Sequence, residues 1–157
     1  MTPAEILNRA RVAGVMIAAA ESCTGGMVMA ALTDVPGSSD VIERGFVTYS
    51  NDAKIQMLGV KPATLEAHGA VSPEVAAEMA LGALAHSQAQ LAVSITGIAG
   101  PGGSEHKPEG RVCFGIARQG VAAKVDVQEF GPLGRDAVRR AARDHALALL
   151  ATALDQP

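Results

Sequence analysis

The stretch Val15-Met16-Ile17-Ala18-Ala19-Ala20-Glu21-Ser22-Cys23-Thr24-Gly25-Gly26 joins a short apolar run to a junction of hydroxyl and glycine residues. An unbroken apolar run of this length is typical of a strand covered on both faces. Backbone N–H groups beyond such a strand suit phosphate or a developing oxyanion. A second junction, Thr96-Gly97-Ile98-Ala99-Gly100-Pro101-Gly102-Gly103, follows the apolar run of residues 91–96. Together they predict a ligand site, although glycines at strand ends also serve simply as turns.

The rest of the chain predicts alternating helices and strands. Helical spacing, first-turn prolines and N-cap residues favour helices over residues 3–12, 27–32, a short segment from 51, a segment from 62, 73–85 and 133–154. Apolar runs favour strands over residues 15–20, 41–49, 91–96, 111–117 and 121–130. Gln119-Gly120 predicts a hairpin turn between the last two strands. We therefore expect residues 1–157 to form one domain, a three-layer α/β/α sandwich around a mixed five-stranded sheet.

Composition and charge limit the class of partner. Of the 157 residues, 48% are hydrophobic and 18% charged, which excludes a disordered chain. The formal net charge is −3 and there is no block of Lys or Arg, so we expect neither nucleic acid nor a membrane as partner. One bound phosphate stays compatible with this charge, because a single local site does not need a basic protein.

Cysteine and histidine are few and scattered. Only Cys23 and Cys113 occur, and the N-terminus lacks the layout of a signal peptide, so we expect a cytoplasmic protein with reduced thiols. The four histidines follow no metal-site spacing. We expect no metal and no cofactor.

Strand topology predicts where the two junctions meet. If the second strand lies on one side of the first and the third on the other, a switch point falls between the first and third strands. Ligands bind at the carboxyl ends of the strands at such a point. Ser22, Tyr49, Lys54 and Thr96 follow strands that end at this edge, so we expect them to line one crevice.

These side chains favour acyl transfer with Ser22 as nucleophile and Lys54 as base. Lowering the pKa of a lysine from about 10.4 to about 7.5 requires about 4 kcal/mol. Tyr49 would relay the proton or hold the amine. Cys23 is the alternative nucleophile, but no histidine lies in the same segments. Each residue also has a structural interpretation, with Ser22 as a helix cap, Tyr49 as a strand end and Lys54 as an exposed helix lysine.

Several ordered motifs resemble the CinA C-terminal domain family across essentially the whole chain. They are the first junction, Gly45-Phe46-Val47-Thr48-Tyr49-Ser50-Asn51 with Lys54, His68-Gly69-Ala70-Val71-Ser72, the second junction, and Lys107-Pro108-Glu109-Gly110. The stand-alone members of this family are nicotinamide mononucleotide amidohydrolases. The resemblance implies the three-layer fold and hydrolysis of the nicotinamide carboxamide to nicotinate mononucleotide and ammonia. It also implies that the family's catalytic serine, tyrosine and lysine are Ser22, Tyr49 and Lys54.

The same hypothesis assigns the nucleotide to the two junctions and the last helix. The expected binding residues are Glu21, Cys23, Thr24, Gly25, Gly26, Thr96, Gly97, Ala99, Gly100, Gly102, Gly103, Arg139 and Arg140. The other arginines of the last helix are expected on a solvated face. The second junction is about one residue shorter than in many members, and Arg111 stands where a small or apolar residue is expected.

Three further expectations concern the whole protein. The chain lacks the molybdopterin-binding-like N-terminal domain of full-length CinA proteins, so we expect a single-domain version. We expect a homo-oligomer, with a dimer as the simplest form. The alternative functions are a nucleotide-binding or regulatory module without chemistry and, less favoured, a structural interaction protein.

Overall fold

The computed structural model describes residues 1–104 and 106–156. Its centre is a five-stranded sheet in the order β2-β1-β3-β4-β5. The strands are β1 (Ile17–Glu21), β2 (Ile42–Val47), β3 (Leu91–Gly97), β4 (Arg111–Arg118) and β5 (Lys124–Glu129). β1 pairs in parallel with β2 and with β3, whereas β4 pairs antiparallel with both β3 and β5. The predicted mixed α/β fold is confirmed, and the order places the switch point between β1 and β3.

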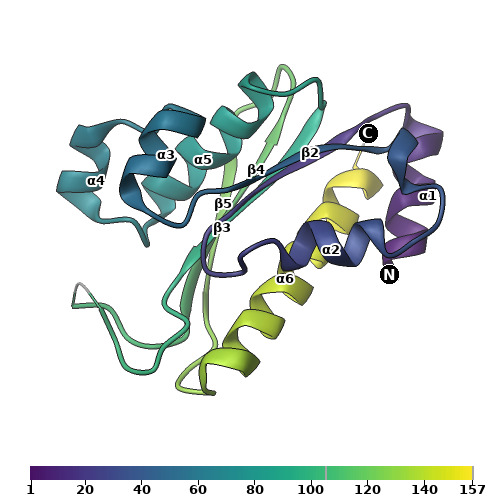
Figure 1. The fold of residues 1–157 in the computed structure, drawn as a ribbon. Coiled ribbons are helices and arrows are strands. Elements are labelled where there is room, and N and C mark those ends of the chain that lie inside the picture. Colours follow the sequence, from purple (N-terminus) through teal and green to yellow (C-terminus); the bar gives the residue numbers. More distant parts are fainter. Residues whose placement is uncertain (105, 157) are drawn as a thin grey trace.

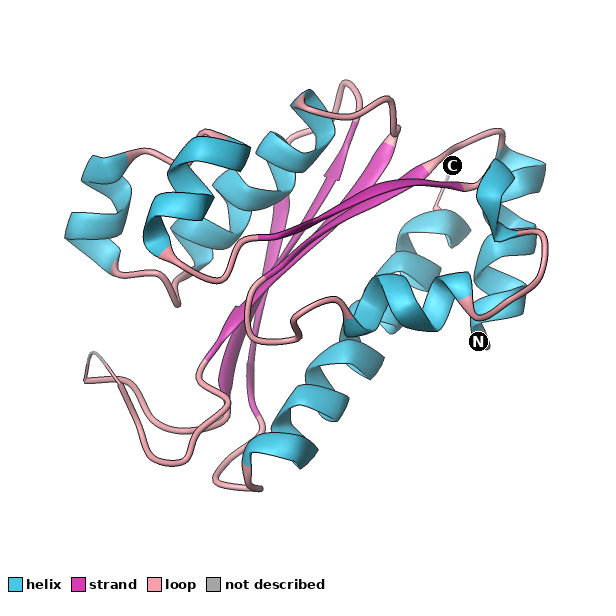
Figure 2. Ribbon diagram, in the orientation of Figure 1, coloured by secondary structure: helices cyan, strands magenta, loops and turns pink. Residues whose placement is uncertain are grey.

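Helices cover both faces of this sheet (Figures 1 and 2). One layer consists of α1 (Pro3–Ala13), α2 (Met27–Thr33) and α6 (Arg135–Asp155), and the other of α3 (Asn51–Leu58), α4 (Pro62–His68) and α5 (Pro73–Ala85). A short 3₁₀ turn, η1 (Ser38–Asp40), precedes β2. Side-chain caps begin several helices: Thr2 forms a capping box with Glu5, and Ser50 and Ser72 cap α3 and α5.

The two faces of the sheet are packed differently. Large side chains such as Phe114 and Leu150 fill the core under α1, α2 and α6. On the other face α5 lies very close to the sheet, because Ser94 Oγ donates to the carbonyl of Ala76 at 2.6 Å. A Cβ atom at Gly115 would collide with that carbonyl and lie 2.7 Å from Ser94 Oγ. A glycine at this position therefore permits the close approach of α5.

The boundaries differ from the prediction mainly in the last hairpin. Gln119-Gly120 lies in the turn, where the N–H of Val121 donates to the carbonyl of Arg118 at 3.3 Å. The ladder ends at the pair Ile116–Lys124, so β5 begins three residues later than predicted. β2 ends at Val47, two residues earlier than predicted. Within the described residues, no helix combines the length and apolar character needed to cross a bilayer.

Candidate active site

A cavity of about 180 Å³ lies at the carboxyl ends of β1 and β3. Ser22, Tyr49, Lys54 and Thr96 all line it, so the convergence predicted from topology is observed. The cavity also receives residues from the segment before α5 and from the first turn of α6. It therefore lies where the strand order reverses, as ligand sites do in open α/β sheets.

Ser22 and Lys54 form a buried pair. The Nζ atom of Lys54 lies 3.1 Å from Ser22 Oγ and donates to the carbonyl of Thr48 at 2.8 Å. Only 1% of Lys54 is exposed, which overturns its interpretation as a solvated helix lysine. The pair forms because α3 begins at the Ser50 cap directly after the second strand and turns Lys54 inward one turn later. A serine hydroxyl and an amine at this distance can exchange a proton.

Tyr49 contacts an arginine rather than the lysine amine. Its hydroxyl accepts from Arg135 Nη2 at 2.5 Å, and 60% of the residue is exposed. Arg135 Nη1 donates to the carbonyl of Gly100 at 2.7 Å, so its guanidinium joins Tyr49 at the cavity to the second junction. Sequence reasoning left Arg135 on the solvated face of the last helix. The signal it missed is position: Arg135 is the first residue of α6, which begins at this edge of the sheet.

Glu21 is completely buried and serves as an internal anion. Its carboxylate accepts from Thr24 Oγ1 at 2.6 Å and from the N–H groups of Gly26, Val28 and Met29 at 3.2, 3.0 and 3.1 Å. Of the N–H groups of the first junction expected to bind phosphate or the oxyanion, that of Gly26 is therefore already bound to Glu21. Glu21 and Thr24 do not line the cavity; the Glu21 carboxylate instead contacts Thr24 and the start of α2.

The two glycines of the first junction turn the chain from β1 into α2. Gly25 and Gly26 have φ values of +58° and +110°, which favour glycine. The N–H of Gly25 donates to the carbonyl of Ser22 at 3.0 Å. Neither glycine lines the cavity, so the turn interpretation accounts for both.

Arg139 fixes the other side of this junction. Its Nε donates to the carbonyl of Cys23 at 3.0 Å and its Nη2 to that of Thr24 at 3.4 Å. Arg140 instead pairs with Asp136 and does not line the cavity. Burial raises the pKa of the Cys23 thiol to about 11, so this group is protonated at neutral pH. Within the described residues, the N–H groups of Cys23 and Thr24 donate to no backbone carbonyl, and that of Cys23 lies against its own thiol.

The first half of the second junction forms a wall of the cavity. Thr96 Oγ1 donates to the carbonyl of Ala70 at 2.9 Å, which joins β3 to the segment before α5. Gly97 and Ala99 line the cavity. A Cβ atom at Gly97 would lie 2.7 Å from the Val112 side chain, so the close approach of β4 favours glycine there.

The second half of this junction lies outside the cavity. Gly100, Gly102 and Gly103 do not line it. The N–H of Gly102 donates to Glu109 Oε1 at 2.7 Å, and a Cβ atom at Gly103 would collide with the carbonyl of Lys107. The Lys107–Glu109 segment therefore packs against Gly102 and Gly103 and holds their backbone in place.

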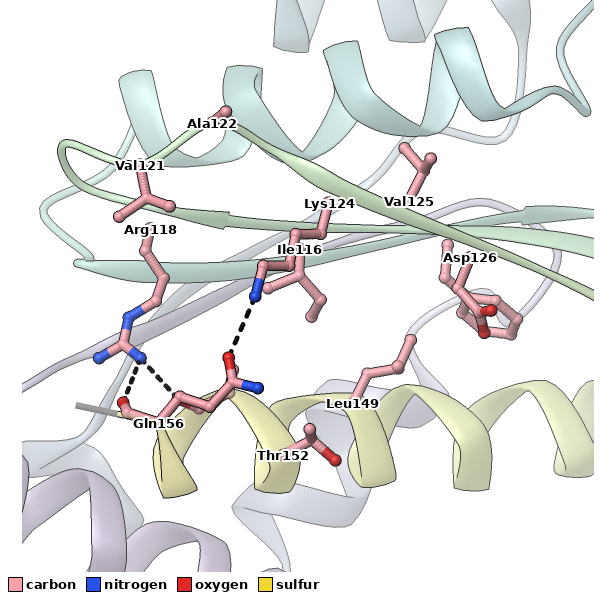
Figure 3. A pocket seen from close by; sticks show the side chains of 12 residues that line it. Ile116, Arg118, Val121, Ala122, Lys124, Val125, Asp126, Leu149, Thr152 and Gln156 are labelled. Carbon is pink, nitrogen blue, oxygen red and sulfur yellow. Dashed lines mark hydrogen bonds between the residues drawn. The ribbon is translucent and has the colours of Figure 1, made fainter.

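Two other regions lie apart from this cavity. Arg111 pairs with Glu129 at 2.6 Å on the β4–β5 surface and does not face the crevice. A larger cavity, of about 350 Å³, lies between the β4–β5 hairpin and the end of α6, where Arg118 and Lys124 both reach Gln156 (Figure 3). Its described lining contains neither serine nor cysteine. Among the described residues no group of three or more His, Cys, Asp and Glu could hold a metal ion.

The chain is similar in sequence to proteins of known name. The nicotinamide-nucleotide amidohydrolase PncC of Escherichia coli K12 is 53% identical over 141 residues, covering 87% of this chain and 83% of the relative. The protein of the same name from Shigella flexneri is 54% identical over 138 residues, with the same coverage.

Solved structures and a family model extend the match to nearly the full length. The competence/damage inducible protein CihA from Agrobacterium tumefaciens superposes with a TM-score of 0.93 at 46% identity, covering 98% of this chain and 93% of that one. A CinA superfamily protein from E. coli superposes with a TM-score of 0.91 at 35% identity, covering 95% of this chain and 86% of that one. The model of the CinA C-terminal domain matches residues 2–154. The chain therefore belongs to the CinA C-terminal domain family.

Proposed function

We propose that this chain is an amidohydrolase that hydrolyses the carboxamide of nicotinamide mononucleotide, with Ser22 as nucleophile and Lys54 as base. The observation that carries the proposal is the buried contact of 3.1 Å between Ser22 Oγ and Lys54 Nζ inside the cavity. The names of the relatives in E. coli and S. flexneri support the reaction and the nucleotide substrate.

The reaction begins with the neutral amine of Lys54. This amine donates one N–H to the carbonyl of Thr48 and accepts the Ser22 hydroxyl proton as Oγ attacks the carboxamide carbon. The N–H groups of Cys23 and Thr24 remain available to the oxyanion, because Glu21 occupies the donors farther along α2. The Lys54 ammonium then gives this proton to the nitrogen of the carboxamide, so that the C–N bond breaks and ammonia leaves. Water activated by Lys54 hydrolyses the acyl-enzyme ester.

The phosphate of the substrate belongs near Arg135. Glu21 already fills the start of α2, and Arg139 is engaged by two carbonyl oxygens, so the first junction offers the phosphate few donors. The Arg135 guanidinium lines the cavity between Tyr49 and Gly100. Its bonds there go to neutral oxygens, which a phosphate would replace with a stronger charge-assisted pair.

Ammonia release tests the function, and Ser22→Ala tests the nucleophile. Wild-type protein should release ammonia from nicotinamide mononucleotide, and Ser22→Ala should release none while its circular dichroism is unchanged. No release by the wild type would favour the alternative, a nucleotide-binding module without chemistry. Turnover near the wild-type rate in folded Ser22→Ala would exclude Ser22 as nucleophile.

We infer a single domain over residues 1–157, a cytoplasmic location and a homodimer. Cys23 and Cys113 are both free and buried, which fits a reducing compartment. Sedimentation of the purified protein tests the dimer. The reaction proposed above uses no metal and no cofactor, so we expect activity to survive EDTA.

A further inference from the structure

The Lys107-Pro108-Glu109-Gly110 motif has no step in the proposed reaction, yet its charged side chains bind the segments that carry cavity-lining residues. Glu109 Oε1 accepts from the N–H of Gly102 at 2.7 Å, and Oε2 accepts from the N–H of Gly134 at 3.1 Å. Gly134 is the N-cap of α6 and directly precedes Arg135. One carboxylate therefore links the second junction to the start of the helix that carries Arg135.

Arg135 links the same two segments a second time. Its Nη1 donates to the carbonyl of Gly100, two residues before Gly102. A Cβ atom at Gly100 would lie 2.5 Å from Glu109 Cδ, so the carboxylate packs directly against this residue. The position of the guanidinium thus depends on where Glu109 holds both the loop and the helix start. Glu109 itself does not line the cavity, so it cannot touch the substrate at its present position.

Lys107 acts on a different wall. Its Nζ donates to the carbonyls of His68 and Val71, both at 2.6 Å. Between them lies Ala70, whose carbonyl accepts from Thr96 Oγ1. The two charged residues of the motif therefore fix separate walls, with Lys107 on the Thr96 side and Glu109 on the Arg135 side.

We propose that Glu109 is a positioning residue that sets Arg135 for the phosphate of the substrate and so determines the preference for a nucleotide over a nucleoside. This inference rests on the proposed function. Glu109→Gln has one amide oxygen for two N–H donors, so either Gly102 or Gly134 loses its acceptor. Misplacement of a binding group by about 1 Å costs up to about 10²-fold. We expect kcat/KM for nicotinamide mononucleotide to fall about 10- to 100-fold, mainly through KM.

The test compares two substrates in a double-mutant cycle. Wild type, Glu109→Gln, Arg135→Met and the double variant are assayed with nicotinamide mononucleotide and with nicotinamide riboside, which lacks the phosphate. Glu109→Gln should lower kcat/KM for the mononucleotide but leave kcat/KM for the riboside within about twofold of the wild-type value. In the Arg135→Met background, Glu109→Gln should lower kcat/KM for the mononucleotide by less than about threefold, because the arginine that Glu109 positions has been removed. The ratio of the two substrates within one protein is independent of any unfolded fraction.

Two control variants separate positioning from general damage. Glu129→Gln removes a carboxylate that pairs with Arg111 outside the cavity, and it should leave kcat/KM unchanged for both substrates. Lys107→Met removes the bonds to the carbonyls of His68 and Val71 on the Thr96 side, and it should lower kcat/KM equally for both substrates.

The inference would be overturned if Glu109→Gln lowered kcat/KM equally for both substrates. It would also be overturned if Glu109→Gln lowered kcat/KM for the mononucleotide as much in the Arg135→Met background as in the wild type. A wild type that hydrolyses both substrates equally would also overturn it, but would leave the amidohydrolase proposal standing. If the wild type releases no ammonia, the proposed function fails. The same four proteins are then titrated with nicotinamide mononucleotide by calorimetry, where the same pattern in Kd supports the positioning role and equal Kd values reject it.

Discussion

Replacing Glu21 with Gln should destabilise the protein severely, because the carboxylate is an acceptor for four buried or partly buried donors. If the amide oxygen takes the place of Oε1, the NH₂ group faces the N–H of Met29, which then lacks an acceptor. An unsatisfied buried donor costs about 1–3 kcal/mol. The three remaining bonds lose their charge assistance, at about 1 kcal/mol each. The sum is about 4–6 kcal/mol, a large part of the stability of an ordinary domain.

Urea unfolding followed by circular dichroism measures this loss. The matched control is Glu78→Gln, since Glu78 also accepts from a helix start, through the N–H of Lys61 and the hydroxyl of Thr64, but is only partly buried. We expect the control to cost about 1 kcal/mol. A loss in Glu21→Gln no larger than in Glu78→Gln would refute the view that Glu21 is the anion that holds the start of α2.

Three further predictions follow from the site and the packing. Lys54→Met keeps the length of the side chain but removes the base, so kcat should fall about 10²- to 10⁴-fold with the circular dichroism unchanged; a loss below tenfold contradicts the base assignment. Cys23→Ala should release ammonia within about threefold of the wild-type rate at pH 7.5, because a thiol with a pKa of about 11 is protonated there; loss of turnover would instead make Cys23 a nucleophile candidate. Gly115→Ala should cost about 1–3 kcal/mol in urea unfolding, since its Cβ would collide with the carbonyl of Ala76. The control is Gly120→Ala, where nothing lies within 4 Å of the added Cβ atom and the φ of +75° costs about 1 kcal/mol of backbone strain. Equal losses of unfolding free energy in the two variants would mean that α5 moves to accommodate the added methyl group.

The sequence was sufficient for the features that depend on local pattern and on crossover handedness. The apolar runs ending in hydroxyl and glycine residues became β1 and β3, and right-handed crossovers correctly placed β2 beside β1. That order alone brings Ser22 and Lys54 to one edge, although 32 residues separate them in sequence. The burial of Lys54 was not predicted, because an exposed helix lysine remained an alternative; the structure shows that α3 begins at a Ser50 cap and that Lys54 is buried.

Side-chain partners across the sheet could not be obtained in this way. Glu21 was expected to contact the nucleotide because it lies beside Ser22 in sequence, whereas its carboxylate accepts from N–H groups at the start of α2. Arg135 and Arg139 lie one helical turn apart, so sequence spacing gives both the same face. Only the positions of Tyr49 and Cys23 decide which of the two lines the cavity.

The location of Tyr49 gives this protein an optical signal at the candidate site. The chain has one tyrosine and no tryptophan, so its intrinsic ultraviolet fluorescence beyond that of phenylalanine comes from this residue alone. The phenol lies on the cavity rim, largely exposed, with its hydroxyl against a guanidinium. A ligand that displaces this contact changes the surroundings of the fluorophore directly. Titrations of unlabelled wild-type protein can therefore follow occupancy of the cavity without an engineered probe or a coupled enzyme.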